Sequence, residues 1–197
     1  KLTIEGPIVK EKSSFILGGR TTYSNWLLGV IPDKSYKNSR ASFYDLNLNV
    51  NHTINPRNNL YLTAYASSDQ FRLNSDTLYK YSNRNINIKW KHNFSNKLYG
   101  TITAGFDQYK YEVSSEKNPV NAFQLAFDIS QASVRADFNY APGNKHNFNF
   151  GFNSIYYKLH PGSYTPQSDQ SLVTRDVLPA EQAVESALYI GDQYELT

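Results

Sequence analysis

Apolar and polar residues alternate with a period of two along most of the chain, as they do in a β-strand that has one apolar and one polar face. The alternation is clearest in the stretches 44–51, 85–91 and 147–153. In the first stretch the apolar positions are Tyr44, Leu46, Leu48 and Val50, and the polar positions are Asp45, Asn47, Asn49 and Asn51. This pattern predicts an all-β chain whose strands have one wet face.

The same pattern along the whole chain predicts about nine strands. They are Lys1–Ile8, Ser13–Ser24, Ser42–Ile54, Leu60–Phe71, Tyr81–His92, Lys97–Tyr111, Asn121–Ala141, His146–Leu159 and Ser186–Thr197. Ala and Glu residues that follow a proline in Pro179–Glu185 favour a single helical turn within a loop. Within Asn121–Ala141, the apolar residues are odd-numbered before Ser130 and even-numbered after Ser133, which indicates a β-bulge near Ser130–Ser133. A tight turn at Gln131 is the weaker alternative, since no Gly, Pro or Asn occurs there.

The connections between these strands alternate between short and long. The short ones are Val9–Lys12, Asn55–Asn59, Asn93–Asn96 and Pro142–Lys145, and the longer ones are Asn25–Ala41, Arg72–Lys80, Glu112–Val120 and His160–Glu185. Outer-membrane barrels have tight periplasmic turns and longer outer loops, and their tilted strands need about 9–11 residues to cross the bilayer. The sequence therefore predicts an antiparallel, up-and-down transmembrane β-barrel.

The composition agrees with a barrel wall. The chain of 197 residues has 16 Tyr, 11 Phe and 2 Trp, so 15% of it is aromatic, yet its mean hydropathy is −0.58. Aromatic residues at two membrane interfaces and a polar face toward a wet lumen require this mixture. The net charge of +3 is too small to indicate nucleic acid as a partner.

Six segments carry a resemblance to a known family. They are Glu5–Ile8, Lys12–Phe15, Gly19–Tyr23, Phe43–Asn47, Asn55–Asn58 and Ala187–Asp192. They resemble strands of TonB-dependent outer-membrane transporters, in the branch that includes the SusC-like proteins. The resemblance implies a barrel of about 22 strands around a plug domain.

On this resemblance, residues 1–197 are the first part of such a barrel, about nine strands of it, with the plug domain and the remaining strands absent. It implies active nutrient uptake across the Gram-negative outer membrane. The implied partners are outer-membrane lipid, the protein's own plug domain and TonB. A surface lipoprotein lid is a further partner that the resemblance raises.

The candidate site residues are polar positions that we expect to face the lumen or the plug: Arg20, Asp45, Asn47 and Asn49. Arg20 lies among small residues in an otherwise apolar strand. On the lipid side it would cost about 2–4 kcal/mol near the midplane. It should therefore point inward, and an ion pair with a neighbouring strand is the simplest role for it.

We expect no catalytic, cofactor-binding or metal site. The spacing Asp45-x-Asn47-x-Asn49 copies the start of a calcium loop, but Val50 stands where that loop needs Gly. The four histidines are scattered, and without Cys there is no thiolate ligand.

Two alternatives stay open at this point. One is a free-standing barrel of about 8 or 10 strands with a structural or adhesive role. The other is a soluble β-sandwich that binds carbohydrate through exposed aromatic residues. The predicted loop aromatics Tyr23, Trp26, Tyr36 and Tyr164 would suit sugars, peptides or a lipoprotein lid.

Overall fold

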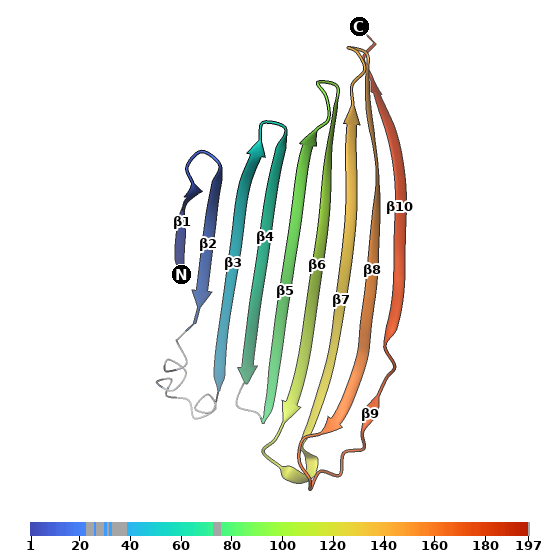
Figure 1. The fold of residues 1–197 in the computed structure, drawn as a ribbon. Coiled ribbons are helices and arrows are strands. Elements are labelled where there is room, and N and C mark those ends of the chain that lie inside the picture. The colour runs from blue at the N-terminus through green and yellow to red at the C-terminus, as the bar shows by residue number, and fades with distance from the viewer. Residues whose placement is uncertain (23–25, 27–29, 31, 33–38, 73–75, 197) are drawn as a thin grey trace.

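The computed structural model describes residues 1–22, 26, 30, 32, 39–72 and 76–196. They form an antiparallel sheet whose long strands follow one another in chain order (Figure 1). Its strands are β1 (Leu2–Val9), β2 (Ser13–Thr21), β3 (Arg40–Asn55), β4 (Asn58–Arg72), β5 (Thr77–Asn93), β6 (Leu98–Ser115), β7 (Phe123–Tyr140), β8 (His146–Pro166), β9 (Asp176–Val177) and β10 (Glu181–Tyr194). The short β9 pairs with β8 off the main path, and a 3-10 turn, η2 (Pro119–Asn121), precedes β7.

The two ends of the sheet differ in their connections. The β1–β2, β3–β4, β5–β6 and β7–β8 turns are short and lie at the upper end in Figure 1. The segments with η2 and β9 lie at the opposite end. We call these the short-turn end and the long-connection end. The predicted up-and-down meander is thus confirmed, with β1 and β10 as its two edges.

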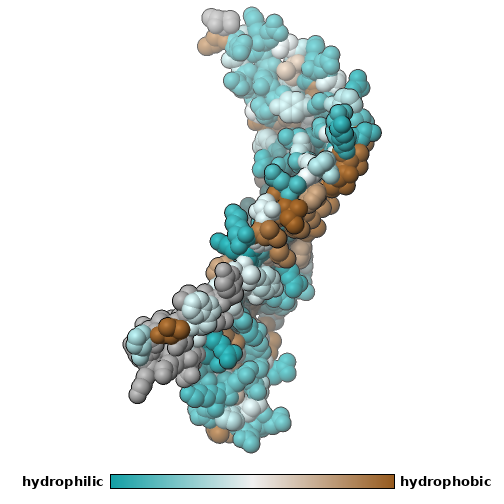
Figure 2. Space-filling model, turned by 90° about the vertical axis from the view of Figure 1, so that its left-hand side faces the viewer, coloured by the Kyte–Doolittle hydropathy of each residue, from teal (hydrophilic) through white to brown (hydrophobic). Residues whose placement is uncertain are grey.

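The strand register separates the side chains into an apolar and a polar face. Successive cross-strand rows of the apolar face are Leu48, Ala64, Ile86 and Phe106, and then Val50, Leu62, Ile88, Ala104 and Val134. We call these rows and the neighbouring ones the apolar band. Figure 2 shows the sheet from its side, with brown apolar residues along one face and teal residues toward both ends.

The apolar band has no second layer packed on it. Among the described residues, the buried hydrophobic side chains are only Val113, Ala122 and Ala136. Large side chains of the band stay accessible, such as Ile86 at 45% and Leu188 at 87%. An apolar face of this extent needs a cover that the described residues do not supply. Within the described part of the chain, no helix has both the length and the apolar character to span a membrane.

Aromatic rings line the apolar face at the short-turn end. They are Trp90, His92, Phe94, Phe138, Tyr140, His146, Phe148, Phe150 and Tyr194, and each has a ring neighbour within this group. The Phe138 and Phe150 centroids are 5.3 Å apart. A row of rings at one border of an apolar band is typical of the membrane interface of a barrel.

The helical turn predicted over Pro179–Glu185 is wrong. Strand β10 begins at Glu181, which pairs with Leu159, and the pairing with β8 continues to Tyr194. Hydrogen bonds to the edge of β8 override the weak local preference of Ala and Glu for helix. Strand β8 also extends beyond its predicted end at Leu159, and β9 was not predicted.

The bulge predicted near Ser130–Ser133 is also misplaced. Strands β6 and β7 pair without interruption from Ser115 to Leu98, and the irregularity lies between Ala126 and Asp128 in the pairing of β7 with β8. Phe127 and Ile129 therefore stay on the polar face. Toward the long-connection end the polar face becomes aromatic, and the other face becomes polar.

Candidate functional site: the polar face of the sheet

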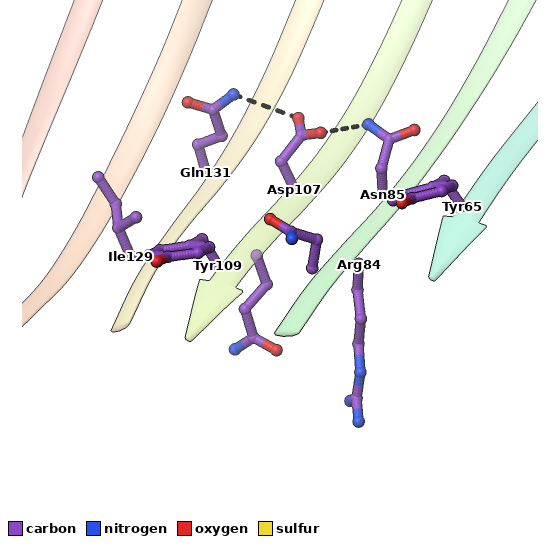
Figure 3. Close-up of a pocket in the computed structure, with 9 residues that line it drawn as sticks. Tyr65, Arg84, Asn85, Asp107, Tyr109, Ile129 and Gln131 are labelled. Carbon is purple, nitrogen blue, oxygen red and sulfur yellow. Dashed lines mark hydrogen bonds between the residues drawn. The ribbon is translucent and has the colours of Figure 1, made fainter. Parts of the chain in front are cut away.

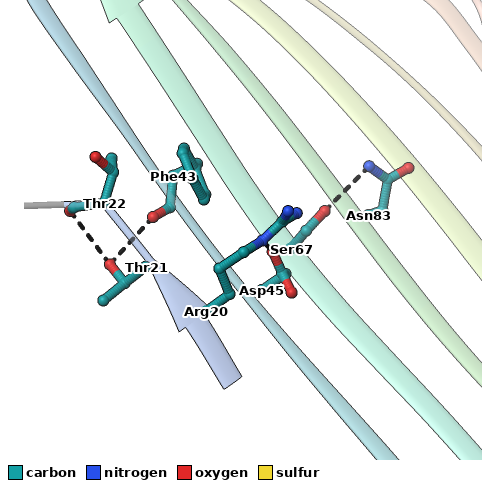
Figure 4. Close-up of polar contacts among 7 residues, drawn as sticks. All are labelled: Arg20, Thr21, Thr22, Phe43, Asp45, Ser67 and Asn83. Atoms are coloured by element: carbon teal, nitrogen blue, oxygen red, sulfur yellow. Dashed lines mark hydrogen bonds and ion pairs between the residues drawn. The ribbon is translucent and has the colours of Figure 1, made fainter. Parts of the chain in front are cut away.

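Arg20 and Asp45 form an ion pair on the polar face (Figure 4). They are cross-strand partners on β2 and β3, and Arg20 Nε donates to Asp45 Oδ2 over 2.7 Å. The Arg20 side chain is 58% exposed and Asp45 is 13% exposed. The guanidinium carbon also lies 5.1 Å from the centre of the Phe43 ring. The ion pair with a neighbouring strand, expected for Arg20, is therefore present.

Asn47 and Asn49 follow Asp45 on the same face of β3 but do not converge with it. Asn47 lies over Gly18, its partner on β2. Asn49 accepts a hydrogen bond of 3.1 Å from Thr63. Alternate residues of a strand are about 6.6 Å apart, so these three side chains do not form one cation site. Within the described ranges, no group of three or more His, Cys, Asp or Glu residues could hold a metal ion. That the four predicted residues face a lumen or a plug stays a prediction.

A hydrogen-bonded row crosses β5, β6 and β7 on the same face of the sheet (Figure 3). Asp107 accepts from the side-chain amide of Asn85 through one carboxylate oxygen and from that of Gln131, over 3.2 Å, through the other. Tyr65 and Tyr109 stand on either side of a hollow of about 340 Å³ that this row lines. Both oxygens of Asp107 are occupied by amide donors, so the carboxylate cross-links three strands. The alternation pattern alone does not predict this row, because its register depends on three strands.

A second polar hollow, of about 400 Å³, lies nearer the short-turn end and is lined in part by Lys89 and Lys91. The Lys91 ammonium lies 5.4 Å from the centre of the Tyr61 ring. Neither lysine takes part in the five ion pairs between described residues. The polar face therefore carries positive charge in this region.

The side chain of Tyr189, on the edge strand β10, extends over β8 and reaches β7. Tyr189 on β10 pairs with Gly151 on β8, and its hydroxyl donates to Asp137 on β7. Asp137 also accepts from Arg135 Nε over 2.9 Å. Because Gly151 has no side chain, the Tyr189 ring can occupy the space above β8 that a Cβ would fill.

Gly151→Val is expected to destabilise the folded complete protein by about 1–3 kcal/mol. A Cβ at position 151 would collide with the Ala136 carbonyl oxygen and lie 2.7 Å from the Tyr189 hydroxyl. The measurement is a urea unfolding titration in phospholipid vesicles. Gly191→Val is the matched control, because a Cβ there meets nothing within 4 Å. Equal unfolding midpoints for the two variants would contradict the packing described for Tyr189.

Five rings form a continuous strip on the polar face at the long-connection end: Phe71, Tyr79, Tyr81, Tyr111 and Phe127. We call it the aromatic strip. Phe71 and Tyr79 are stacked with centroids 4.8 Å apart, and the Tyr111 and Phe127 centroids are 4.7 Å apart. Such rings can stack on a flat surface of a solute. The misplaced bulge had assigned Phe127 to the other face, so the strip was not predicted.

The four aromatic residues predicted to lie in loops differ in where the structure places them. Tyr164 lies within β8, not in a loop, and contacts Phe123 at a centroid distance of 5.3 Å. Trp26 is 62% exposed. Tyr23 and Tyr36 lie outside the described residues.

The polar face thus offers hydrogen-bonding groups, charges and rings along the full height of the sheet. Three of its carboxylates, Asp45, Asp107 and Asp137, are engaged by Arg, Asn, Gln or Tyr partners. This arrangement can bind polar solutes or another protein surface. Together the two faces define the class of structure: an antiparallel up-and-down sheet of the kind that forms the wall of a transmembrane β-barrel.

Solved structures support this class, although no protein-family model and no curated protein matches the sequence. The fold is similar to BauA, the ferric preacinetobactin receptor from Acinetobacter baumannii, with a TM-score of 0.66 and 12% identity over 96% of this chain and 35% of that one. It is similar to the ferripyoverdine receptor of the outer membrane of Pseudomonas aeruginosa, with a TM-score of 0.66 and 11% identity over 99% of this chain and 33% of that one. For the copper transporter OprC the TM-score is 0.63 and the identity 10%, over 93% of this chain and 30% of that one.

The chain spans about a third of the length of these three proteins. At this level of identity the likeness concerns the fold. The sheet matches part of the barrel of outer-membrane receptors, and the predicted fold class is confirmed.

Proposed function

We propose that this chain forms part of the barrel wall of a TonB-dependent outer-membrane receptor that takes up a nutrient actively. The observation that carries the proposal is the contrast between the two faces. One face has an apolar band bordered by aromatic rings at the short-turn end, which fits lipid. The other has ion pairs, amides and lysines, which fit a wet lumen that holds a plug domain.

The long-connection end would face the outside of the cell, and the short turns the periplasm. Substrate would meet the aromatic strip first and then the polar hollows. The complete protein would act with TonB and its own plug domain, as a transporter and not as an enzyme. The similar folds of BauA, OprC and the ferripyoverdine receptor support this reading.

Within the family we place the chain in the SusC-like branch and in the first part of the barrel, with a surface lipoprotein lid as a further partner. The six segments that resemble this branch support that finer assignment. The four residues Arg20, Asp45, Asn47 and Asn49 would then contact the lumen or the plug.

The two alternatives fit the structure less well. A β-sandwich needs a second sheet against the apolar face, and the described residues form a single layer. A small closed barrel needs its edges to pair, whereas β1 and β10 lie at opposite edges of the sheet (Figure 1).

Cysteine labelling of the complete protein in cells tests the proposal. The chain has no Cys of its own, so each introduced thiol reports one position. Gln170→Cys, at the long-connection end, should react with a membrane-impermeant maleimide on intact cells. Asn144→Cys, in the turn between β7 and β8, should react only after the outer membrane is permeabilised.

Both residues are exposed, so burial does not explain a difference in labelling. The reverse pattern would overturn the orientation. Equal labelling of both thiols in a soluble fraction would overturn the membrane assignment.

A further inference from the structure

The apolar band ends abruptly toward the long-connection end. The row that contains Ala64, Ile86, Phe106, Ala132 and Tyr156 is followed by a row that contains Ala66, Arg84, Gln108, Ser130 and Lys158. From β5 to β8, apolar side chains are replaced by polar and charged ones within two residues. On the proposed function, this border lies where acyl chains give way to lipid headgroups.

Arg84 lacks a nearby carboxylate on this face. Its direct partners across the strands are Ala66 and Gln108. The neighbours two residues away along β5 are Ser82 and Ile86. Figure 3 shows the Arg84 side chain directed away from the row of Asn85, Asp107 and Gln131 on the polar face. Arg84 is exposed and takes part in none of the five ion pairs between described residues.

Lys158 has a similar environment three strands away. Its partners across the strands are Ser130 and Gln182. The carboxylate of Asp128, two residues from Ser130 along β7, is engaged by His160 Nδ1 at 3.1 Å. Farther from the band, Lys80 and Glu112 form an ion pair of 2.7 Å. Lys158, like Arg84, takes part in none of the five ion pairs between described residues.

The spacing of the two cations leaves room for a ligand between them. Arg84 and Lys158 lie in one row with β6 and β7 between them, which separates their Cα atoms by about 14 Å. The intervening side chains, Gln108 and Ser130, are polar and uncharged. Lys110, one row farther on β6, is exposed and adds a third cation opposite Asp128.

We propose that Arg84 and Lys158, with Lys110 behind them, bind the phosphate groups of lipopolysaccharide in the outer leaflet. The acyl chains of the same molecule would lie on Phe106, Ala132 and Tyr156 in the next row. A free phosphate would leave this apolar row unused, whereas a lipid with phosphates on its headgroup satisfies both features. Cations close to an anionic lipid surface each strengthen attachment about fivefold.

Binding of purified lipid A to the complete receptor in detergent tests this inference, which rests on the proposed function. The test variant is Arg84→Gln with Lys158→Gln. The control is Lys89→Gln with Lys91→Gln, which removes the same charge from the other face. The test variant should bind bisphosphorylated lipid A about 30-fold more weakly than the unchanged protein does. The control, and a variant with Arg84→Lys and Lys158→Arg, should bind it nearly as well as the unchanged protein.

The unchanged protein should also bind dephosphorylated lipid A several-fold more weakly. Equal binding of both lipids, or equal losses in the test variant and the control, would overturn the inference. Heat-modifiable gel mobility shows whether each variant is folded before it is compared. The cysteine labelling keeps the two proposals apart. If labelling places the protein in the outer membrane but the test variant binds lipid A as well as the unchanged protein does, only this inference fails.

Discussion

Leu62→Arg is expected to lower the free energy of unfolding of the complete protein in a bilayer by about 2–4 kcal/mol. Leu62 lies on β4 in the middle of the apolar band, between Val50 on β3 and Ile88 on β5. An arginine there would place a guanidinium in hydrocarbon, near the depth at which the cost is greatest. The effect is measured by a denaturant titration in phospholipid vesicles.

Thr63→Arg is the matched control, one residue farther along the same strand. Thr63 is exposed on the polar face and donates to Asn49 over 3.1 Å. Losing that exposed hydrogen bond should cost at most about 1 kcal/mol. Equal losses at positions 62 and 63 would show that lipid does not cover the apolar face, and the membrane assignment would be withdrawn.

The long strands and their order could be predicted from the sequence because both depend on local signals. Side chains of a strand alternate between its faces, so the apolar band is visible as a period of two. Short turns are marked by their residues, as in Asn93–Asn96. Each of these features needs only a few consecutive residues, and the structure has the expected hairpins.

The errors fall where a distant strand decides the local conformation. Glu181–Glu185 looks helical in isolation but pairs with β8, which ends 15 residues earlier in the chain, at Pro166. The change of parity in β7 has a different cause from a bulge. A strand need not keep one face apolar along its whole length, and in this sheet the two faces exchange character beyond the apolar band. Phe127 and Ile129 therefore needed no bulge at Ser130–Ser133.

The site could be predicted as a face but not as a set of contacts. The sequence places Asp45, Asn47 and Asn49 on one side of a strand. The contact between Arg20 and Asp45 depends on the register between β2 and β3, which local sequence patterns do not predict across so long a connection. Asn85 and Asp107 are different, because counting outward from the turn at 94–97 would have placed them opposite each other. Gln131 completes that row only through the register across the longer connection between β6 and β7.

Residues 1–197 expressed alone are expected not to form a stable monomeric barrel. Strand β1, with 8 residues, and β10, with 14, form the edges of the sheet. Each would present backbone groups without a partner strand, and each such group costs several kcal/mol in hydrocarbon. In water the edges would be exposed together with the apolar band, which favours aggregation.

The fragment is purified in detergent and its gel mobility is compared before and after heating, with the complete protein as the control. A closed barrel migrates differently when it is heated, because the folded form resists the detergent. The complete protein should show this shift and the fragment should not, since further strands are needed to bridge β1 and β10. A sharp, heat-modifiable monomer of the fragment would show that these strands close on themselves. The larger receptor barrel would then have to be given up in favour of a small free-standing barrel with a structural or adhesive role.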